Sequence, residues 1–343
     1  MLASLVLAPV LLAAGPIPAD TLPLRVVVDS ARHEVLIEYR VDAPPHATAA
    51  VAEGEHADHD GHGGDHTGHS QRLLRFEWPI DGWLRGAQVE LEDAAGDPLP
   101  QARLHHVNLL NFDRRQLVHA AVERLYAAGQ ETAPVLFPPT VGTPIARGAR
   151  LGLLAAFAPA DLPTGSLIRL RLRWMPATMT PKPVAVYPVL VDVGFRPGES
   201  PAYDLPPGRS VRELTFTFPL SGRILAAGGH MHDHGVSLTL EEVGGDEVLR
   251  LESALSEDGR MRSIPLRLFG VTGRGRPLRA GREYRLRVEY DNRTRATIAE
   301  GAMGELALLF APDRPDAWPK ADPADPLIAA DLEGLSAHER ATF

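Results

Sequence analysis

Three histidines alternate with other residues in the segment Gly228–Gly235: His230, His232 and His234. Apolar residues flank the segment on both sides, which favours a β-strand. Because successive side chains on a strand point to opposite faces, His230 and His232 share a face. Two imidazoles on one face can provide two ligands to one metal ion. The glycines have no side chain, so a third ligand can come close. We therefore interpret this stretch as a copper site.

Met303 is the candidate third ligand, because it opens a late predicted strand, Gly301–Phe310. A thioether beside two imidazoles favours Cu(I) and permits cycling between Cu(I) and Cu(II). Spacing alone favours a core role for Met303 over a ligand role. The alternative is a zinc site of His230, His232 and His234, since all three alternate onto one face. Zinc with an open position would activate water.

A second candidate site contains the adjacent residues His105 and His106. Adjacent side chains on a regular strand point to opposite faces, so these two need a local distortion to share one ion. His119 is the only other histidine between His106 and His230. The polar, glycine-rich segment Pro44–Ser70 carries five more histidines between His56 and His69. We predict that this segment is a disordered loop that binds Cu(II), Zn(II) or Ni(II) loosely, for metal capture or only incidentally.

Chain length, net charge and the absence of cysteine limit the classes of function that this protein can have. The chain of 343 residues is long enough for two domains, and its net charge of −9 argues against a general nucleic-acid-binding surface. It has no cysteine, so it has neither a disulfide framework nor a thiolate metal site. Any metal must therefore be held by His, Met, Asp or Glu.

The N-terminus resembles a signal peptide. Leu2–Ala14 is almost wholly apolar and is followed by the small-residue stretch Gly15–Ala19, although no Lys or Arg precedes it. Thirteen apolar residues are too few to span a bilayer comfortably. We expect cleavage of residues 1–19, a periplasmic or secreted location and no stable membrane span.

Two internal matches indicate a duplicated unit. Phe76–Gly82 recurs as Phe216–Gly222, and Gly165–Trp174 recurs as Gly281–Tyr290, in the same order. The many short apolar stretches between Gly, Pro and Asp residues predict strands, and no long stretch has a helical period.

The predicted fold class is all-β, with two tandem antiparallel β-sandwich domains of jelly-roll-like type. The N-terminal sandwich is expected at 20–178 with the His-rich insertion at 44–70, and the C-terminal sandwich at 186–313. A proline-rich linker at 179–185 separates them, and a Pro/Asp/Ala-rich tail at 314–343 follows.

The sequence resembles the copper type II, ascorbate-dependent monooxygenases, the family of peptidylglycine α-hydroxylating monooxygenase and dopamine β-monooxygenase. The likeness covers roughly Leu73 to Asp313. It is clearest in Leu104–Leu110, in Gly229-His-Met-His232 and in the stretch from Gly281 to Phe310. It implies two jelly-roll sandwiches, each carrying one copper.

By position, the resemblance assigns His230, His232 and Met303 to the oxygen-activating copper. It assigns His105 and His106 to two of the three ligands of the electron-storing copper. It also implies that ascorbate reduces both coppers, and that dioxygen is used to hydroxylate a C–H bond of a small-molecule or peptide substrate.

One departure from the family pattern leaves the activity open. Arg173 stands about where the third histidine of the electron-storing site is expected, and an arginine does not ligate copper. His119 or the His56–His69 loop would have to complete that site, or the site is degenerate. The first hypothesis is thus an exported copper monooxygenase. The second is a non-catalytic copper-binding or copper-buffering protein, and a lower third is a structural sandwich that uses metal for stability.

Overall fold

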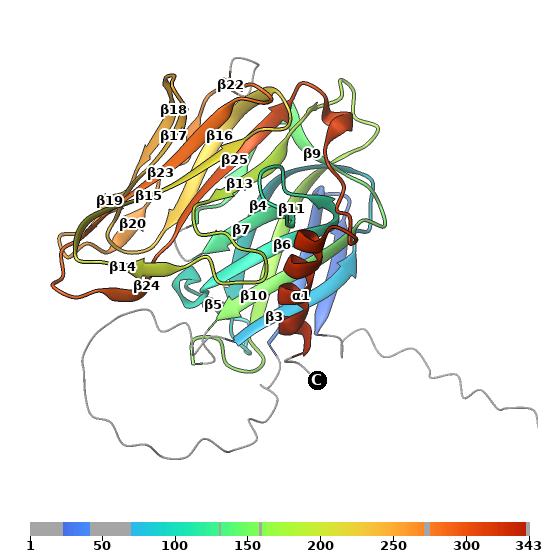
Figure 1. The fold of residues 1–343 in the computed structure, drawn as a ribbon. Coiled ribbons are helices and arrows are strands. Elements are labelled where there is room, and N and C mark those ends of the chain that lie inside the picture. Colours follow the sequence, from blue (N-terminus) through green and yellow to red (C-terminus); the bar gives the residue numbers. More distant parts are fainter. Residues whose placement is uncertain (1–22, 42–69, 130–131, 158–159, 271–274, 341–343) are drawn as a thin grey trace, which may run out of the picture.

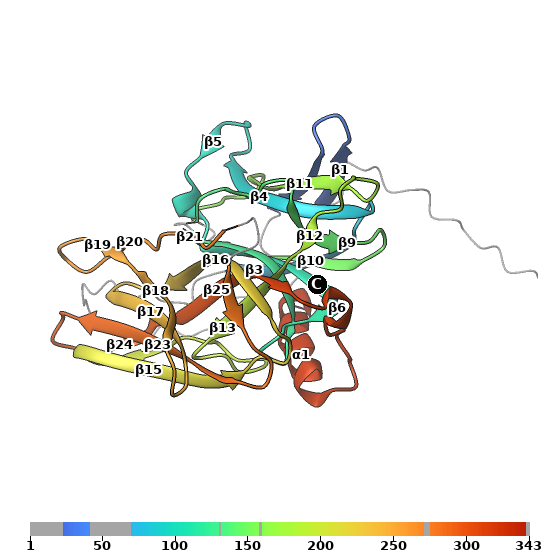
Figure 2. The ribbon, with the colours of Figure 1, turned by 90° about the horizontal axis from the view of Figure 1, so that it is seen from above.

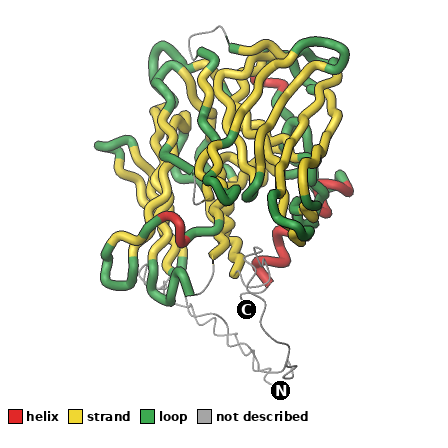
Figure 3. The backbone as a smooth tube through the Cα atoms, turned by 90° about the vertical axis from the view of Figure 1, so that its left-hand side faces the viewer, coloured by secondary structure: helices red, strands yellow, loops and turns green. Residues whose placement is uncertain are grey.

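The computed structural model describes residues 23–41, 70–129, 132–157, 160–270 and 275–340. The predicted signal peptide at 1–19 and the histidines of the 44–70 insertion lie outside the described residues. Strands dominate, and helix is confined to short segments (Figure 3). In the described part of the chain, no helix is long and apolar enough to cross a membrane.

The N-terminal sandwich consists of two sheets around one core (Figures 1 and 2). On β11 the apolar side chains of Leu170 and Leu172 are buried and the arginines between them face outward, as the alternation predicts. The first sheet has the order β1 (Leu24–Asp29), β2 (Glu34–Arg40), β11 (Leu167–Pro176), β4 (Gly82–Glu92), β9 (Val141–Ile145) and β12 (Val184–Ala185), with β5 (Pro98–Leu99) and β8 (Val135–Leu136) also paired to β4. The second sheet has the order β3 (Ser70–Glu77), β10 (Arg150–Phe157), β6 (His106–Arg115) and β7 (Val122–Gly129).

The C-terminal sandwich is built in the same way around its own core. One sheet has the order β13 (Tyr187–Asp192), β25 (Gly304–Pro312) and β16 (Gly222–Met231), with β21 (Arg267–Leu268) and β22 (Arg276–Leu278) both paired to β16. The other has the order β15 (Gly208–Thr217), β23 (Glu283–Asn292), β17 (Gly235–Glu242) and β18 (Glu247–Glu252). Two small sheets pair β14 (Tyr203–Leu205) with β24 (Ile298–Ala302) and β19 (Ala254–Leu255) with β20 (Met261–Ser263). The predicted all-β fold of two antiparallel sandwiches is confirmed.

The two sandwiches share one topology. The order β2-β11-β4 corresponds to β13-β25-β16, and β3-β10-β6-β7 corresponds to β15-β23-β17-β18. Corresponding strands also follow one another in the same order along the chain. The sequence-predicted duplication is therefore visible in the fold itself.

The first predicted repeat is structurally equivalent in both sandwiches. Phe76–Gly82 leads from β3 into β4, and Phe216–Gly222 leads from β15 into β16. Three residues further on, each strand has a β-bulge, at Arg85 and at Leu225. The carbonyl oxygen of each bulge residue accepts a backbone hydrogen bond from the residue after β8 or β21, at 2.7 and 2.8 Å.

The second predicted repeat is wrong, because Gly165–Trp174 and Gly281–Tyr290 belong to non-equivalent strands, β11 and β23. The true counterpart of Gly281–Tyr290 is Gly148–Phe157. The N–H of Gly148 donates to the Trp78 carbonyl (2.8 Å), as that of Gly281 donates to the Phe218 carbonyl (3.0 Å). Strands that are covered on one side alternate apolar and charged residues whatever their place in the sheet. The shared pattern therefore did not indicate that the two strands are equivalent.

The linker and the tail both join the sandwiches. β12 lies within the predicted linker and pairs in parallel with β9 of the N-terminal sandwich. The Pro/Asp/Ala-rich tail contains a 3-10 turn, Pro315–Ala317, and the helix α1 (Pro326–Arg340). α1 lies against the β3-β10-β6-β7 sheet, on the face away from the other N-terminal sheet (Figure 2).

Candidate metal centre

The pairing of β16 with β25 brings the predicted copper ligands together. His230 lies opposite Glu305 and Met231 lies opposite Gly304, which is the last pair of the ladder, and His232 and Met303 follow directly after this pair. Opposed residues project to the same face of a sheet. The rings of His230 and His232 lie with their centroids 5.5 Å apart, while Met231 between them is buried in the core. His230, His232 and Met303 thus lie at the same end of this strand pair.

The Tyr290 hydroxyl holds two of these residues by their backbones. It accepts hydrogen bonds from the N–H groups of His232 (3.1 Å) and Met303 (3.0 Å), and it donates one to the Met303 carbonyl. Met303 lies between β24 and β25 and is partly exposed. It therefore does not have the fully buried environment that a purely structural core residue would have.

A row of polar side chains extends from His230 across the sheet. Glu305 on β25 lies opposite His230 on one side and opposite Asp192 of β13 on the other. Asp192 is only 2% exposed and its carboxylate accepts a hydrogen bond from the Gly194 N–H (2.7 Å). Burial, with the charge of Glu305 adding to it, raises the pKa of Asp192 to about 7. The candidate centre thus borders a carboxylate pair.

His234 does not continue the alternation of His230 and His232, which is a correction to the three-histidine zinc hypothesis. β16 ends at Met231, and His234 has a positive φ of 68° in the turn that follows. Its N–H donates to the Gly259 carbonyl (2.7 Å), and its buried ring packs against Gly259. Across the described residues, no group of three or more His, Cys, Asp or Glu side chains is placed to hold a metal ion.

His105 and His106 do face each other, through the local distortion that the sequence required. The chain bends at His105, just before β6 begins at His106, while the His105 N–H still donates to the Ala156 carbonyl (3.1 Å). The two Nδ1 atoms lie 2.9 Å apart. The pair can offer two nitrogen donors to one ion.

His119 does not complete the His105–His106 pair, contrary to one expectation from the sequence. It lies beyond the opposite end of β6, a 10-residue strand that spans roughly 30 Å. Its Nε2 accepts a hydrogen bond from the Asp192 N–H (2.9 Å), and its ring stacks near Phe195. Burial, reinforced by the charge of Arg124, lowers the pKa of His119 to about 4. His119 is thus a neutral acceptor between the sandwiches.

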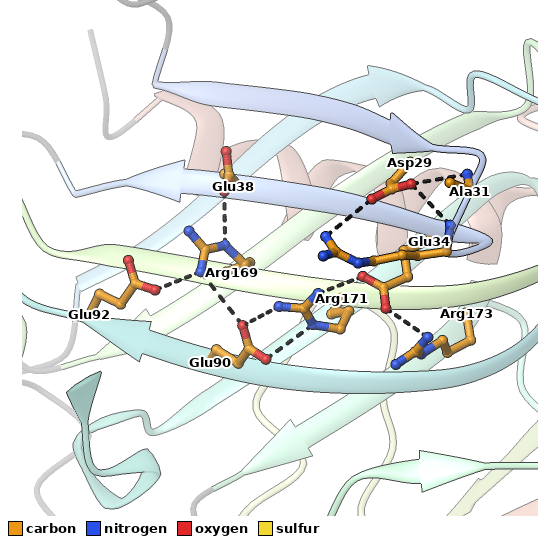
Figure 4. A network of polar contacts seen from close by, with 10 residues as sticks. Asp29, Ala31, Glu34, Glu38, Glu90, Glu92, Arg169, Arg171 and Arg173 are labelled. Carbon is orange, nitrogen blue, oxygen red and sulfur yellow. Dashed lines mark hydrogen bonds and ion pairs between the residues drawn. The ribbon is translucent and has the colours of Figure 1, made fainter. Parts of the chain in front are cut away.

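Arg173 also lies apart from the histidine pair, in the opposite sheet of the N-terminal sandwich. Its guanidinium contacts Glu34 at 2.7 Å, and Glu34 in turn contacts Arg171. Arg171 also contacts Glu90 at 2.9 Å, within the larger network of Figure 4. Arg173 therefore belongs to an ion-pair network.

The duplication shows what replaces the candidate ligands in the other sandwich. The β4–β11 pairing has the same register and bulge as the β16–β25 pairing. The residues equivalent to His230, His232, Met303 and Glu305 are Glu90, Glu92, Leu167 and Arg169, respectively. The N-terminal sandwich thus has ion pairs of Glu90 and Glu92 where the C-terminal sandwich has the candidate ligands His230 and His232 (Figure 4).

Two residues of the centre were missed from the sequence. Tyr290 is one of the buried residues of the alternating strand β23, like many core residues, and Asp192 ends β13. Their roles arise from neighbours distant in the chain, so no local pattern could have identified them.

Comparison with known proteins adds little. No protein family and no curated protein matches the chain by sequence. A chain in the structure of Sulfolobus Turreted Icosahedral Virus aligns with 79% of this chain and 94% of its own length, at 11% identity and a TM-score of 0.36. VP2 of an infectious bursal disease virus subviral particle aligns with 95% of this chain and 91% of its own, at 13% identity and a TM-score of 0.19. Similarities this weak carry no argument about fold or function.

Proposed function

We propose that this chain is an exported copper-binding protein that holds one copper ion with His230, His232 and Met303. The observation that supports the proposal is the β16–β25 pairing: His230 lies in its second-to-last pair, and His232 and Met303 directly follow its last pair. The donor set fits copper, because a thioether with two imidazoles suits Cu(I) and tolerates Cu(II). Export rests on the apolar N-terminal segment.

The candidate activity is hydroxylation of a C–H bond, as the resemblance to the ascorbate-dependent monooxygenases implies. Copper in this centre would supply one-electron redox chemistry, with ascorbate as reductant and dioxygen as oxidant. The protein residues orient the ion: the shared face of β16 presents the imidazoles, and Tyr290 fixes the backbones of His232 and Met303. The substrate is a small molecule or a peptide.

A second candidate, a copper-binding or copper-buffering protein without catalysis, is favoured by a separate observation. His105 and His106 have no third histidine beside them within the described residues, since His119 and Arg173 are engaged elsewhere. An enzyme that stores an electron at a second copper would need that site. The His56–His69 segment would then serve copper capture.

Copper titration tests the proposal. Replacing the five histidines of 56–69 by serine removes background binding, and Met303→Leu is then compared with Met179→Leu, a partly exposed methionine of the linker region. We expect Met303→Leu to weaken Cu(I) binding by about tenfold or more, which is ~1.4 kcal/mol. Cu(II) binding should change less, because Cu(II) depends little on a thioether. Equal Cu(I) affinity in the two variants would contradict the assigned ligand.

Oxygen uptake separates the two functions. Ascorbate-dependent uptake by the copper-loaded protein, lost in His232→Ala, is expected of a monooxygenase. Stoichiometric copper binding without uptake across a broad substrate panel would favour the binding protein.

A further inference from the structure

All the hydrogen bonds of the Tyr290 hydroxyl are made with residues of the candidate metal centre. The ring is buried in the C-terminal core on β23 and packs edge-on against Tyr203. A phenol has one donor and two acceptor positions. All three are used, by the N–H groups of His232 and Met303 and by the Met303 carbonyl.

These bonds begin where the strand ladder ends. The last pair of the β16–β25 ladder is Met231 with Gly304, and His232 and Met303 directly follow it. Strand ends open more easily than strand centres. The Tyr290 hydroxyl connects the two backbones just beyond the last pair, because it bonds to both.

The duplication provides an internal comparison for this hydroxyl. Tyr290 lies opposite Ser210 on β15, and its counterpart Phe157 lies opposite Ser70 on β3. Both rings are buried, at 2% and 3% exposure. The sandwich with Phe157 has no imidazole or thioether at the equivalent positions, which hold Glu90, Glu92 and Leu167. The hydroxyl therefore occurs in the copy that has the imidazoles and the thioether and is missing from the copy that lacks them.

From this coincidence we infer that Tyr290 is a positioning residue that sets the preference of the centre for Cu(I) over Cu(II). The inference rests on the proposed function. A thioether contributes strongly to Cu(I) binding and weakly to Cu(II) binding. Holding the Met303 backbone beside His232 therefore stabilises the Cu(I) form more than the Cu(II) form.

The test compares Tyr290→Phe with Tyr284→Phe in the full chain. Tyr290→Phe reproduces the residue that the other sandwich carries, so the core can accept it. Tyr284 is a matched control: it lies on the same strand, is 1% exposed, and its hydroxyl accepts one hydrogen bond, from the Arg279 N–H (2.9 Å). Both variants lose a buried hydroxyl, but only one loses contact with the centre.

We expect Tyr290→Phe to lower the Cu(I) affinity by about 10–100-fold, the usual range for groups that orient metal ligands. The Cu(II) affinity should fall much less, so the Cu(I)/Cu(II) affinity ratio decreases. X-ray absorption of the Cu(I) form should show a weakened or lost copper–sulfur contribution. In metal-free Tyr290→Phe, the amides of His232 and Met303 should exchange hydrogen faster than in the metal-free wild-type protein. Tyr284→Phe should leave the ratio and these amides unchanged.

The outcomes are distinguishable. Equal losses of Cu(I) and Cu(II) affinity in Tyr290→Phe would overturn the inference, since they would indicate general loosening. Unchanged Cu(I) binding in Tyr290→Phe, with normal binding by the wild-type protein, would overturn the inference alone. A wild-type protein that binds no Cu(I) would overturn the proposed function as well.

Discussion

The His119 imidazole acts at the boundary of the sandwiches as an uncharged hydrogen-bond acceptor. β13 has a free edge on this side, and two of its N–H groups find side-chain partners from the β6–β7 connection. Gln116 accepts from the Leu190 N–H (3.2 Å) and His119 accepts from the Asp192 N–H (2.9 Å). Protonating the accepting nitrogen of His119 would destroy its bond.

His119 therefore predicts a specific pH dependence of stability. Its pKa is about 4 in the folded protein against an ordinary 6.5. Between these values the unfolded chain binds more protons, so stability rises with pH through this window and is lost as pH falls from about 6.5 toward 4. The wild-type protein should lose about 2–3 kcal/mol from this group by pH 4.5. In His119→Gln, whose amide oxygen can accept the same N–H, this loss should disappear.

Urea unfolding of both proteins at pH 7.0, 5.5 and 4.5 measures the effect. Other groups, such as the buried Glu123 with its raised pKa, contribute equally to both proteins and cancel in the difference. A constant difference between the two free energies across this range would show that His119 is not held neutral.

The candidate centre could be predicted from the sequence only in part. The spacing of His230 and His232 fixes their common face, because alternation is a local property of strands. The ligand role of Met303 stays a prediction, although Met303 lies directly after the last pair of the β16–β25 ladder. The positions of His119 and His234 were not, because one depends on which sheet edge a loop meets and the other on a turn with positive φ.

At the scale of elements, two glycines precede His230 on β16, and they differ in how closely other residues approach them. Gly228 has open space on its side: a Cβ there would meet only Leu266, at an ordinary 3.6 Å. Gly229 faces the core, where a Cβ would overlap the Leu238 side chain and come within 2.8 Å of the Glu305 carbonyl oxygen. Only one of the two glycines is required by packing.

Gly229→Ala and Gly228→Ala form a matched pair on one strand. We expect Gly229→Ala to destabilise the protein by about 1–3 kcal/mol, because the Leu238 side chain and the β25 backbone must both shift. It should also weaken Cu(I) binding, since Glu305 lies opposite His230. Gly228→Ala should change stability by less than about 1 kcal/mol, in either direction. Thermal unfolding and Cu(I) titration check both, and equal effects would contradict this account of β16.

The sequence predicted which segments form strands, because alternation of side chains is a local property. It did not predict which strands are equivalent, because equivalence depends on how strands pair. The short strands and the absence of long helices follow from local pattern. The false match of β11 with β23 arose because both alternate apolar residues with arginines, while strand equivalence depends on distant partners. The bulges at Arg85 and Leu225 carry no sequence signal, since their two residue types are unrelated.

At the scale of the whole molecule, the C-terminal tail fastens the two sandwiches together. Trp318 is buried in the core of the C-terminal sandwich and stacks on Tyr187, with ring centroids 4.1 Å apart. Further along, Leu335 of α1 is buried with residues of the N-terminal sandwich such as Phe112. The Pro/Asp/Ala-rich tail therefore contributes buried residues to both sandwiches.

Asp331 is the polar anchor of this tail. It is 4% exposed, accepts a hydrogen bond from the Val122 N–H (2.9 Å), and binds both terminal nitrogens of Arg124 at 2.8 and 2.9 Å. Removing one partner of a buried pair leaves the other charge uncompensated. Glu333, on the same helix, is exposed and provides a control.

We expect Asp331→Ala to destabilise the protein by about 3–5 kcal/mol, and Glu333→Ala by less than about 0.5 kcal/mol. Hydrogen exchange should accelerate in α1 and β7 first, because the lost bonds connect those two elements. Cu(I) affinity at neutral pH should stay within about twofold of wild type, since the metal centre lies in the other sandwich and its hydrogen bonds do not involve the tail. A large loss of Cu(I) affinity in Asp331→Ala would mean that the tail also fixes the relative placement of the two sandwiches, and that the candidate metal centre depends on this placement.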